Sequence, residues 1–159
     1  MAASRSLTSL RPNAQRLALQ WHNDCEVAGI DVLVYCTYRG PIEQAALYAQ
    51  GRRPIAEVNK LRAEAGISKL FPGQNKKIVT KAKPFWSMHQ YAIAWDAAPM
   101  EAGKIVWNTK SPLWQPMGMC ARKLGIEWGG YWTRFLDMPH FQVMEGKTVR
   151  QIVEDAGNA

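Results

Sequence analysis

Cysteine and histidine are both scarce in this sequence, with three of each among 159 residues. The cysteines, Cys25, Cys36 and Cys120, are odd in number and widely spaced. That pattern suits neither a disulfide framework nor a cysteine-based zinc site. We therefore expect the three thiols to be reduced residues of the core.

Long apolar runs are also missing. No window approaches the ~18 uninterrupted apolar residues of a membrane-spanning helix. The opening stretch MAASRSLTSLRPNAQ lacks the apolar centre that a secretory signal needs. We expect a protein that is made in the cytoplasm and is not stably inserted in a membrane.

What the sequence does have is a globular composition and an excess of positive charge. Hydrophobic residues make up 47% of the chain, and its length suits a single domain over residues 1–159. The net charge of +7 favours polyanionic partners such as nucleic acid, anionic lipid or an acidic envelope polymer. The densest basic segment, residues 76–83, holds only four lysines, which is a weak nucleic-acid signature, so we expect no nucleic-acid partner.

Hydrophobic spacing and turn residues predict a mixture of helices and short strands. Because they do not alternate regularly as βαβ units, the predicted class is α+β, with a small antiparallel sheet flanked by helices. No internal repeat is visible. The predicted helices are residues 12–25, 41–51, 55–65, 113–124 and 148–155, and the predicted strands are 31–38, 78–80, 93–97, 104–107, 126–128 and 140–143.

The stretch SMHQYAIAWD places His89 seven residues before Asp96 in an apolar run. Seven extended residues span roughly 23 Å, so the two side chains share a metal only if a turn lies between them. Residues 90–92 are a poor turn by composition, and residues 93–97 are predicted to continue as the strand that carries Asp96. Taken alone, this pair is better explained as a hydrogen-bonded polar pair in the core.

A second segment, LDMPHF, changes that balance because Asp137 and His140 flank the rigid Pro139. Two histidines and one carboxylate form a known catalytic zinc set that leaves a fourth position for water. A further carboxylate is what a zinc hydrolase needs as its general base. The two segments together supply all four residues.

These segments resemble the peptidase M15 family, in particular bacteriophage endolysins that are L-alanyl-D-glutamate peptidases, relatives of the VanY and VanX D-alanyl-D-alanine peptidases. The family carries S-x-H-x6-D and a later (E/D)-x-x-H, which here run from Ser87 through His89 to Asp96 and from Asp137 to His140. The resemblance implies a Hedgehog/DD-peptidase-like zinc peptidase fold.

Two further stretches extend the resemblance over residues 10–142, namely WGGYW at 128–132 and TYRGPIEQAALYAQGR at 37–52. Two departures lie beside the first histidine, because Gln90 and Ala92 stand where the family usually has asparagine and glycine. The missing glycine bears on the turn geometry. A third departure, the bulky Pro84–Trp86 segment before Ser87, bears on the substrate groove.

The resemblance implies a role for each matching residue. His89, Asp96 and His140 would bind Zn²⁺, and Asp137 would be the general base. Arg39 would stabilise the carbonyl oxygen as it becomes an oxyanion, a role that suits a fixed guanidinium.

Four more residues are candidates for substrate binding. Ser87 belongs to the first motif, and Gln44 lies in the segment that follows Arg39. Trp128 and Trp132 are chosen from seven tryptophans because aromatic faces stack on sugars, although most tryptophans pack in cores.

The expected function is that of an endolysin that cleaves the L-Ala–D-Glu bond of peptidoglycan stem peptides and lyses the host cell. We expect a monomer that stays in the host cytoplasm until a holin releases it to the periplasm and cell wall. The alternatives are a D-alanyl-D-alanine carboxypeptidase of the same fold and a non-catalytic module that binds the cell wall. Nucleic-acid binding is a third alternative, supported by charge alone.

Overall fold

The structure, a computed structural model, describes residues 3–158 and divides them into two compact units. The first unit contains Ala3 with residues 39–90 and 147–158, and the second contains residues 4–38 and 91–146. The single domain expected over the whole chain stays a prediction. No helix among the described residues is both long and apolar enough to cross a membrane.

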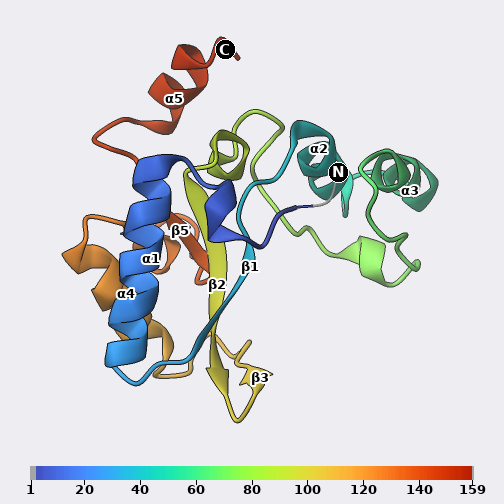
Figure 1. Cartoon of the computed structure of the whole chain (residues 1–159). Coiled ribbons are helices and arrows are strands. Elements are labelled where there is room, and N and C mark those ends of the chain that lie inside the picture. Colours follow the sequence, from blue (N-terminus) through green and yellow to red (C-terminus); the bar gives the residue numbers. More distant parts are fainter. Residues whose placement is uncertain (1–2, 159) are drawn as a thin grey trace. The chain divides into compact units, whose positions relative to one another are not determined.

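The second unit contains the sheet (Figure 1). Its strands pair antiparallel in the order β1-β2-β5-β4, and β3 pairs with β2 beside this path. β2 is the longest strand and the one that both β1 and β5 flank. The bounds are β1 Val32–Cys36, β2 Ala94–Glu101, β3 Lys104–Ile105, β4 Glu127–Trp128 and β5 His140–Gln142.

Two helices of this unit, α1 (Pro12–Val27) and α4 (Trp114–Lys123), lie beside the sheet (Figure 1). Their apolar residues form one core with Trp95 of β2 and Phe141 of β5. The ring of Trp21 on α1 lies 5.7 Å from Trp95 and 4.6 Å from Phe141, centroid to centroid. Aromatic pairs at such distances add to the stability gained from burial.

Strand alternation explains which residues this core leaves on the other face of the sheet. Successive side chains of a strand point to opposite faces. Because Trp95 and Phe141 point into the core, their neighbours Asp96 and His140 point to the opposite face. The sheet therefore separates an aromatic face from a polar face.

The first unit is built mainly from helices. In it, α2 (Pro41–Ala49) packs against α3 (Ile55–Glu64), and a segment with a short 3₁₀ helix, η2 (Gln74–Lys76), follows. The C-terminal helix α5 (Val149–Asp155) starts with a capping box, in which Thr148 and Gln151 bond each other's backbone amides. A second 3₁₀ helix, η3 (Met88–Tyr91), lies where the first unit meets β2 in sequence.

The predicted α+β class and the small antiparallel sheet with flanking helices are confirmed. The strand predicted at residues 78–80 is wrong, because this segment is irregular. Ile78 and Val79 have strand-forming side chains but are 51% and 46% exposed. A Cβ built on Gly51 would lie 2.8 Å from the Ile78 nitrogen, so the segment packs against the end of α2 and pairs with no strand.

The turn that a shared ligand site requires between His89 and Asp96 is present. η3 reverses the chain, and Ala92 follows it with φ of 55°. This is the left-handed region, which costs a residue with a side chain roughly 1–2 kcal/mol. Ala92 is held there by a hydrogen bond from the Arg11 amide to its carbonyl oxygen, 2.8 Å long.

Replacing Ala92 by glycine is expected to raise the free energy of unfolding by about 0.5–1 kcal/mol, because relief of strain outweighs the added freedom of the unfolded chain. Urea unfolding measures the change. Ala63→Gly, on the exposed face of α3, is the matched control and is expected to lower the stability by about 1 kcal/mol. Destabilisation by both substitutions would show that Ala92 is not strained.

Candidate metal centre

The pairing of β2 with β5 brings Asp96 directly opposite His140. Their side chains meet on the polar face, where the Nδ1 atom of His140 lies 3.3 Å from the Oδ1 atom of Asp96. The side chains of His140 and Asp96 are 10% and 14% exposed. Two predicted metal ligands, 44 positions apart in sequence, are thus neighbours that are largely buried.

The segment from Asp137 to His140 is a tight turn that enters β5. The amide of His140 donates to the carbonyl oxygen of Asp137 over 3.0 Å, and the amide of Ala97 donates to the carbonyl oxygen of Pro139 over 3.0 Å. The indole nitrogen of Trp128 donates to the carbonyl oxygen of Met138 over 2.6 Å. These bonds fix the half-buried Asp137 one turn before His140.

The predicted substrate residues Trp128 and Trp132 differ in their surroundings. Trp128 is 1% exposed and packs on Phe141, so its observed contacts are those of a core residue that supports the turn. Trp132 is half-buried, and its ring centroid lies 5.3 Å from that of His140. Substrate contact stays a prediction for both, and only Trp132 lies beside a predicted metal ligand.

His89 lies in η3 with short contacts inside the first unit. The amide of Arg39 donates to the carbonyl oxygen of His89 over 3.3 Å. The side chain of Gln90 accepts a hydrogen bond of 2.6 Å from the amide of Phe85, whose φ is 66°. Ser87 is buried, and its carbonyl oxygen accepts from the amide of Gln90 over 3.0 Å. The bulky segment before Ser87 is therefore held by the glutamine that replaces the family's asparagine.

Gln44 was predicted to bind substrate, and its observed contacts orient Arg39. It is fully buried, and its Oε1 atom accepts a hydrogen bond of 3.0 Å from Nη1 of Arg39. Its amide nitrogen donates to the carbonyl oxygen of Ala82 over 2.7 Å and to the hydroxyl of Thr80 over 3.3 Å. Because an amide nitrogen only donates, these bonds fix which side of Gln44 meets the guanidinium.

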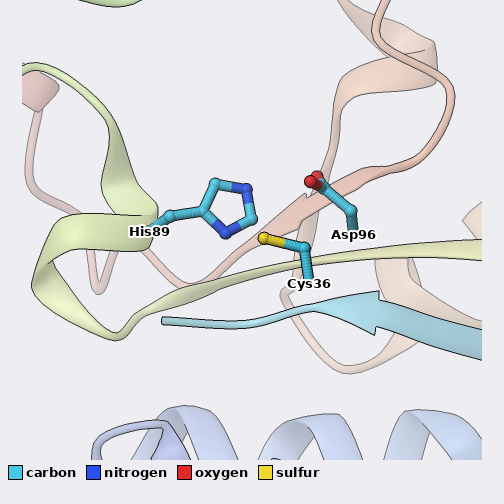
Figure 2. Close-up of side chains that lie close together, drawn as sticks. All are labelled: Cys36, His89 and Asp96. Carbon is cyan, nitrogen blue, oxygen red and sulfur yellow. The ribbon is translucent and has the colours of Figure 1, made fainter. Parts of the chain in front are cut away.

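Cys36 is a residue at this site that sequence reasoning set aside as a core cysteine. It is buried, as predicted, but a bulge in β1 pairs it with Asp96 of β2. Its sulfur, a ring nitrogen of His89 and a carboxylate oxygen of Asp96 lie within 4.8 Å of one another (Figure 2). Sequence spacing gave no signal for this, because the contact depends on strand register.

The other two cysteines lie away from this group, on α1 and α4. Both are buried. Burial, together with the neighbouring Cys120, raises the pKa of the Cys25 thiol well above its ordinary value. Cys25 therefore stays protonated and is a poor metal ligand, as the prediction of a reduced core residue requires.

The pair of Asp96 and His140 fits a divalent metal ion. Ligands bonded tetrahedrally to zinc at 2.0–2.1 Å are separated by about 3.3 Å. The observed 3.3 Å between Oδ1 and Nδ1 equals that separation. Imidazole nitrogen and carboxylate oxygen are both common zinc ligands, and cysteine sulfur is another.

Comparisons with known proteins point the same way. A family model described as D-alanyl-D-alanine carboxypeptidase matches residues 80–143. The chain is 34% identical over 125 residues to the peptidoglycan L-alanyl-D-glutamate endopeptidase CwlK of Bacillus subtilis (strain 168), a match that covers 73% of this chain. The chain belongs to the peptidase M15 family.

Solved structures show the same fold. The L-Ala D-Glu endopeptidase ChiX of Serratia marcescens has a TM-score of 0.55 at 20% identity, over 95% of this chain and 92% of that one. The D,D-pentapeptidase VanY, solved in complex with Zn(II), has a TM-score of 0.52 at 12% identity, over 91% of this chain and 78% of that one. The match to CwlK spans 62% of the length of that relative.

Gly129 lies so close to the turn that carries Asp137 that it leaves no room for a side chain. Its carbonyl oxygen accepts from the amide of Asp137 over 3.0 Å, and a Cβ at this position would lie 2.4 Å from the carbonyl oxygen of Asp137. Any side chain would therefore displace the turn that carries Asp137.

Gly129→Ala is expected to lower the free energy of unfolding by about 1–3 kcal/mol, as overpacking does. Gly73→Ala is the matched control because nothing lies within 4 Å of its added Cβ, and it should leave stability nearly unchanged. Urea unfolding of both variants is the measurement. Equal stability of the two variants would contradict the close approach.

Proposed function

We propose that this protein is a zinc-dependent peptidase of bacterial peptidoglycan that hydrolyses the bond between L-alanine and D-glutamate. The observation that carries the proposal is the pair of Asp96 and His140 on the polar face of the sheet, with Asp137 fixed in the turn before β5. A general base beside the ligands of a metal ion is the arrangement that metal-assisted hydrolysis requires.

In this proposal His89, Asp96 and His140 hold the metal ion. The support for His89 is its place in the family motif and its ring nitrogen near the carboxylate of Asp96. When bound, zinc supplies Lewis-acid polarisation of the scissile carbonyl. Cys36 is left out of the set, because a fourth protein ligand would close the position that a catalytic site keeps open.

The protein's own groups would then move the proton and stabilise the charge. The carboxylate of Asp137 accepts a proton from the attacking water and returns it to the leaving amine. The guanidinium of Arg39, oriented by Gln44, stabilises the oxygen of the carbonyl as negative charge develops on it. Ser87 and Trp132 are proposed to contact the substrate, and substrate contact by Gln44 and Trp128 stays a prediction.

The choice of the L-Ala–D-Glu bond rests on relatives. CwlK and ChiX are both named for this specificity. The family model and VanY carry names of D-alanyl-D-alanine or D,D-peptidases, so a carboxypeptidase that removes terminal D-alanine is the second candidate. A non-catalytic module that binds the cell wall is the third.

The proposal extends to biology through the resemblance to phage endolysins. The protein would lyse a bacterial host, act as a monomer, and need a holin to pass from the host cytoplasm to the periplasm and cell wall. Its net charge of +7 supports attraction to an anionic envelope.

The test is mass spectrometry of purified peptidoglycan digested with and without a chelator. New amino-terminal D-glutamate that disappears with chelator and returns with zinc is the expected result. Released D-alanine would support the carboxypeptidase, and the absence of any product under every metal condition would overturn both peptidase proposals.

Asp137→Asn is expected to lower the rate of this digestion by about 10²–10⁴-fold, because the amide cannot accept the proton. Circular dichroism should show an unchanged fold. The control is Asp31→Asn, an exposed position before β1, which should digest at the wild-type rate. Wild-type turnover by the Asp137→Asn protein would remove Asp137 from the mechanism.

A further inference from the structure

A chain of hydrogen bonds inside the second unit runs from the indole of Trp132 to the ring of His140. The indole nitrogen of Trp132 donates to Oε1 of Glu127 over 2.6 Å. The amide nitrogen of Gln142 donates to the other carboxylate oxygen, Oε2, over 3.1 Å. The Oε1 atom of Gln142 lies 2.9 Å from Nε2 of His140.

The register of the sheet builds this chain. His140 and Gln142 are two positions apart on β5, so their side chains share the polar face. Glu127 of β4 is the cross-strand partner of Gln142. Gln142 is 4% exposed, so reversing its amide would leave buried polar atoms without good partners, which is costly.

The chemistry of the chain fixes where the ring proton of His140 sits. An ionised carboxylate only accepts hydrogen bonds, so Glu127 requires the NH₂ group of Gln142 to face it. The carbonyl oxygen of Gln142 therefore faces His140. Because a carbonyl oxygen also only accepts, the Nε2 atom of His140 must carry a hydrogen.

We propose that Glu127 and Gln142 are positioning residues that hold neutral His140 in the tautomer with hydrogen on Nε2. The lone pair of the ring is then on Nδ1, the atom that lies 3.3 Å from Oδ1 of Asp96. The chain thereby assigns Nδ1 as the atom of His140 that binds the metal. This inference rests on the proposed metal centre, although its tests do not require peptidase activity.

The first test is nitrogen NMR of the metal-free protein labelled with ¹⁵N-histidine, at a pH well above the usual histidine pKa of about 6.5. The chain has only three histidines, so His22→Gln and His89→Gln variants assign the signals. His140 is expected to show a hydrogen on Nε2 and none on Nδ1. In Gln142→Leu the two tautomers should mix. A hydrogen on Nδ1 in the wild-type protein would overturn the proposal.

The second test is zinc affinity, measured by competition with a chelator. Gln142→Leu is expected to weaken binding about 10- to 100-fold, as loss of such outer partners does. Glu127→Gln is an isosteric change at an exposed position. It keeps one side-chain oxygen, which accepts from one of the two donors, so it should weaken zinc binding less than Gln142→Leu does. Gln20→Leu, on the exposed part of α1, is the control and should bind zinc like the wild type.

The double variant separates positioning from a merely structural role. If the two residues act through one chain, Glu127→Gln adds no further loss of affinity to Gln142→Leu. Additive losses, or unchanged affinity in Gln142→Leu, would contradict the proposal. Thermal unfolding of each variant shows whether it is folded. If Gln142→Leu does not fold, the zinc affinity of Glu127→Gln alone tests the proposal. A protein that binds zinc as described yet cleaves no peptidoglycan would refute the proposed function alone.

Discussion

The antiparallel register between β2 and β5 is the constraint on which the site depends. It sets Asp96 opposite His140 and, on the other face, Trp95 opposite Phe141. A slip of one residue in either strand would turn its polar side chain into the aromatic core and its aromatic ring out to solvent. The stability of the core and the geometry of the site are therefore set by the same pairing.

The aromatic side of the sheet is what makes that register unambiguous. Four aromatic side chains there are each no more than 1% exposed, and Phe141 contacts the other three, which are Trp21, Trp95 and Trp128. Burying one such side chain contributes roughly 1.5–3 kcal/mol, so a slipped register would lose several times the strength of a typical hydrogen bond. The polar face carries groups that are individually costly to bury, and the aromatic face offsets that cost.

Most helices and strands, and the two candidate metal ligands Asp96 and His140, could be predicted from the sequence. Hydrophobic spacing and turn residues located every strand of the sheet, and the motif resemblance selected His89, Asp96, Asp137 and His140. Three features were out of reach because they depend on pairing between distant strands. The bulge that sets Cys36 beside Asp96 has no local signature, and neither does the pairing of Glu127 with Gln142. Residues 78–80 were predicted as a strand from β-branched side chains, although no neighbouring strand is available to them.

The positive φ of Ala92 illustrates how the chain accommodates alanine where the family usually has glycine. A glycine is the residue expected at a left-handed turn, yet the chain keeps the turn with alanine because η3 and the bond from Arg11 determine the path into β2. Pattern matching flagged the position, and only the structure gave its conformation.

X-ray absorption at the zinc edge of the zinc-loaded protein tests the central claim most directly, because it identifies the atoms bound to the metal. An open catalytic centre built on His89, Asp96 and His140 predicts only nitrogen and oxygen neighbours at about 2.0–2.2 Å, with imidazole scattering from two histidines. A sulfur neighbour at about 2.3 Å would place Cys36 in the fourth position and contradict the account, since a closed four-ligand site is structural and not hydrolytic.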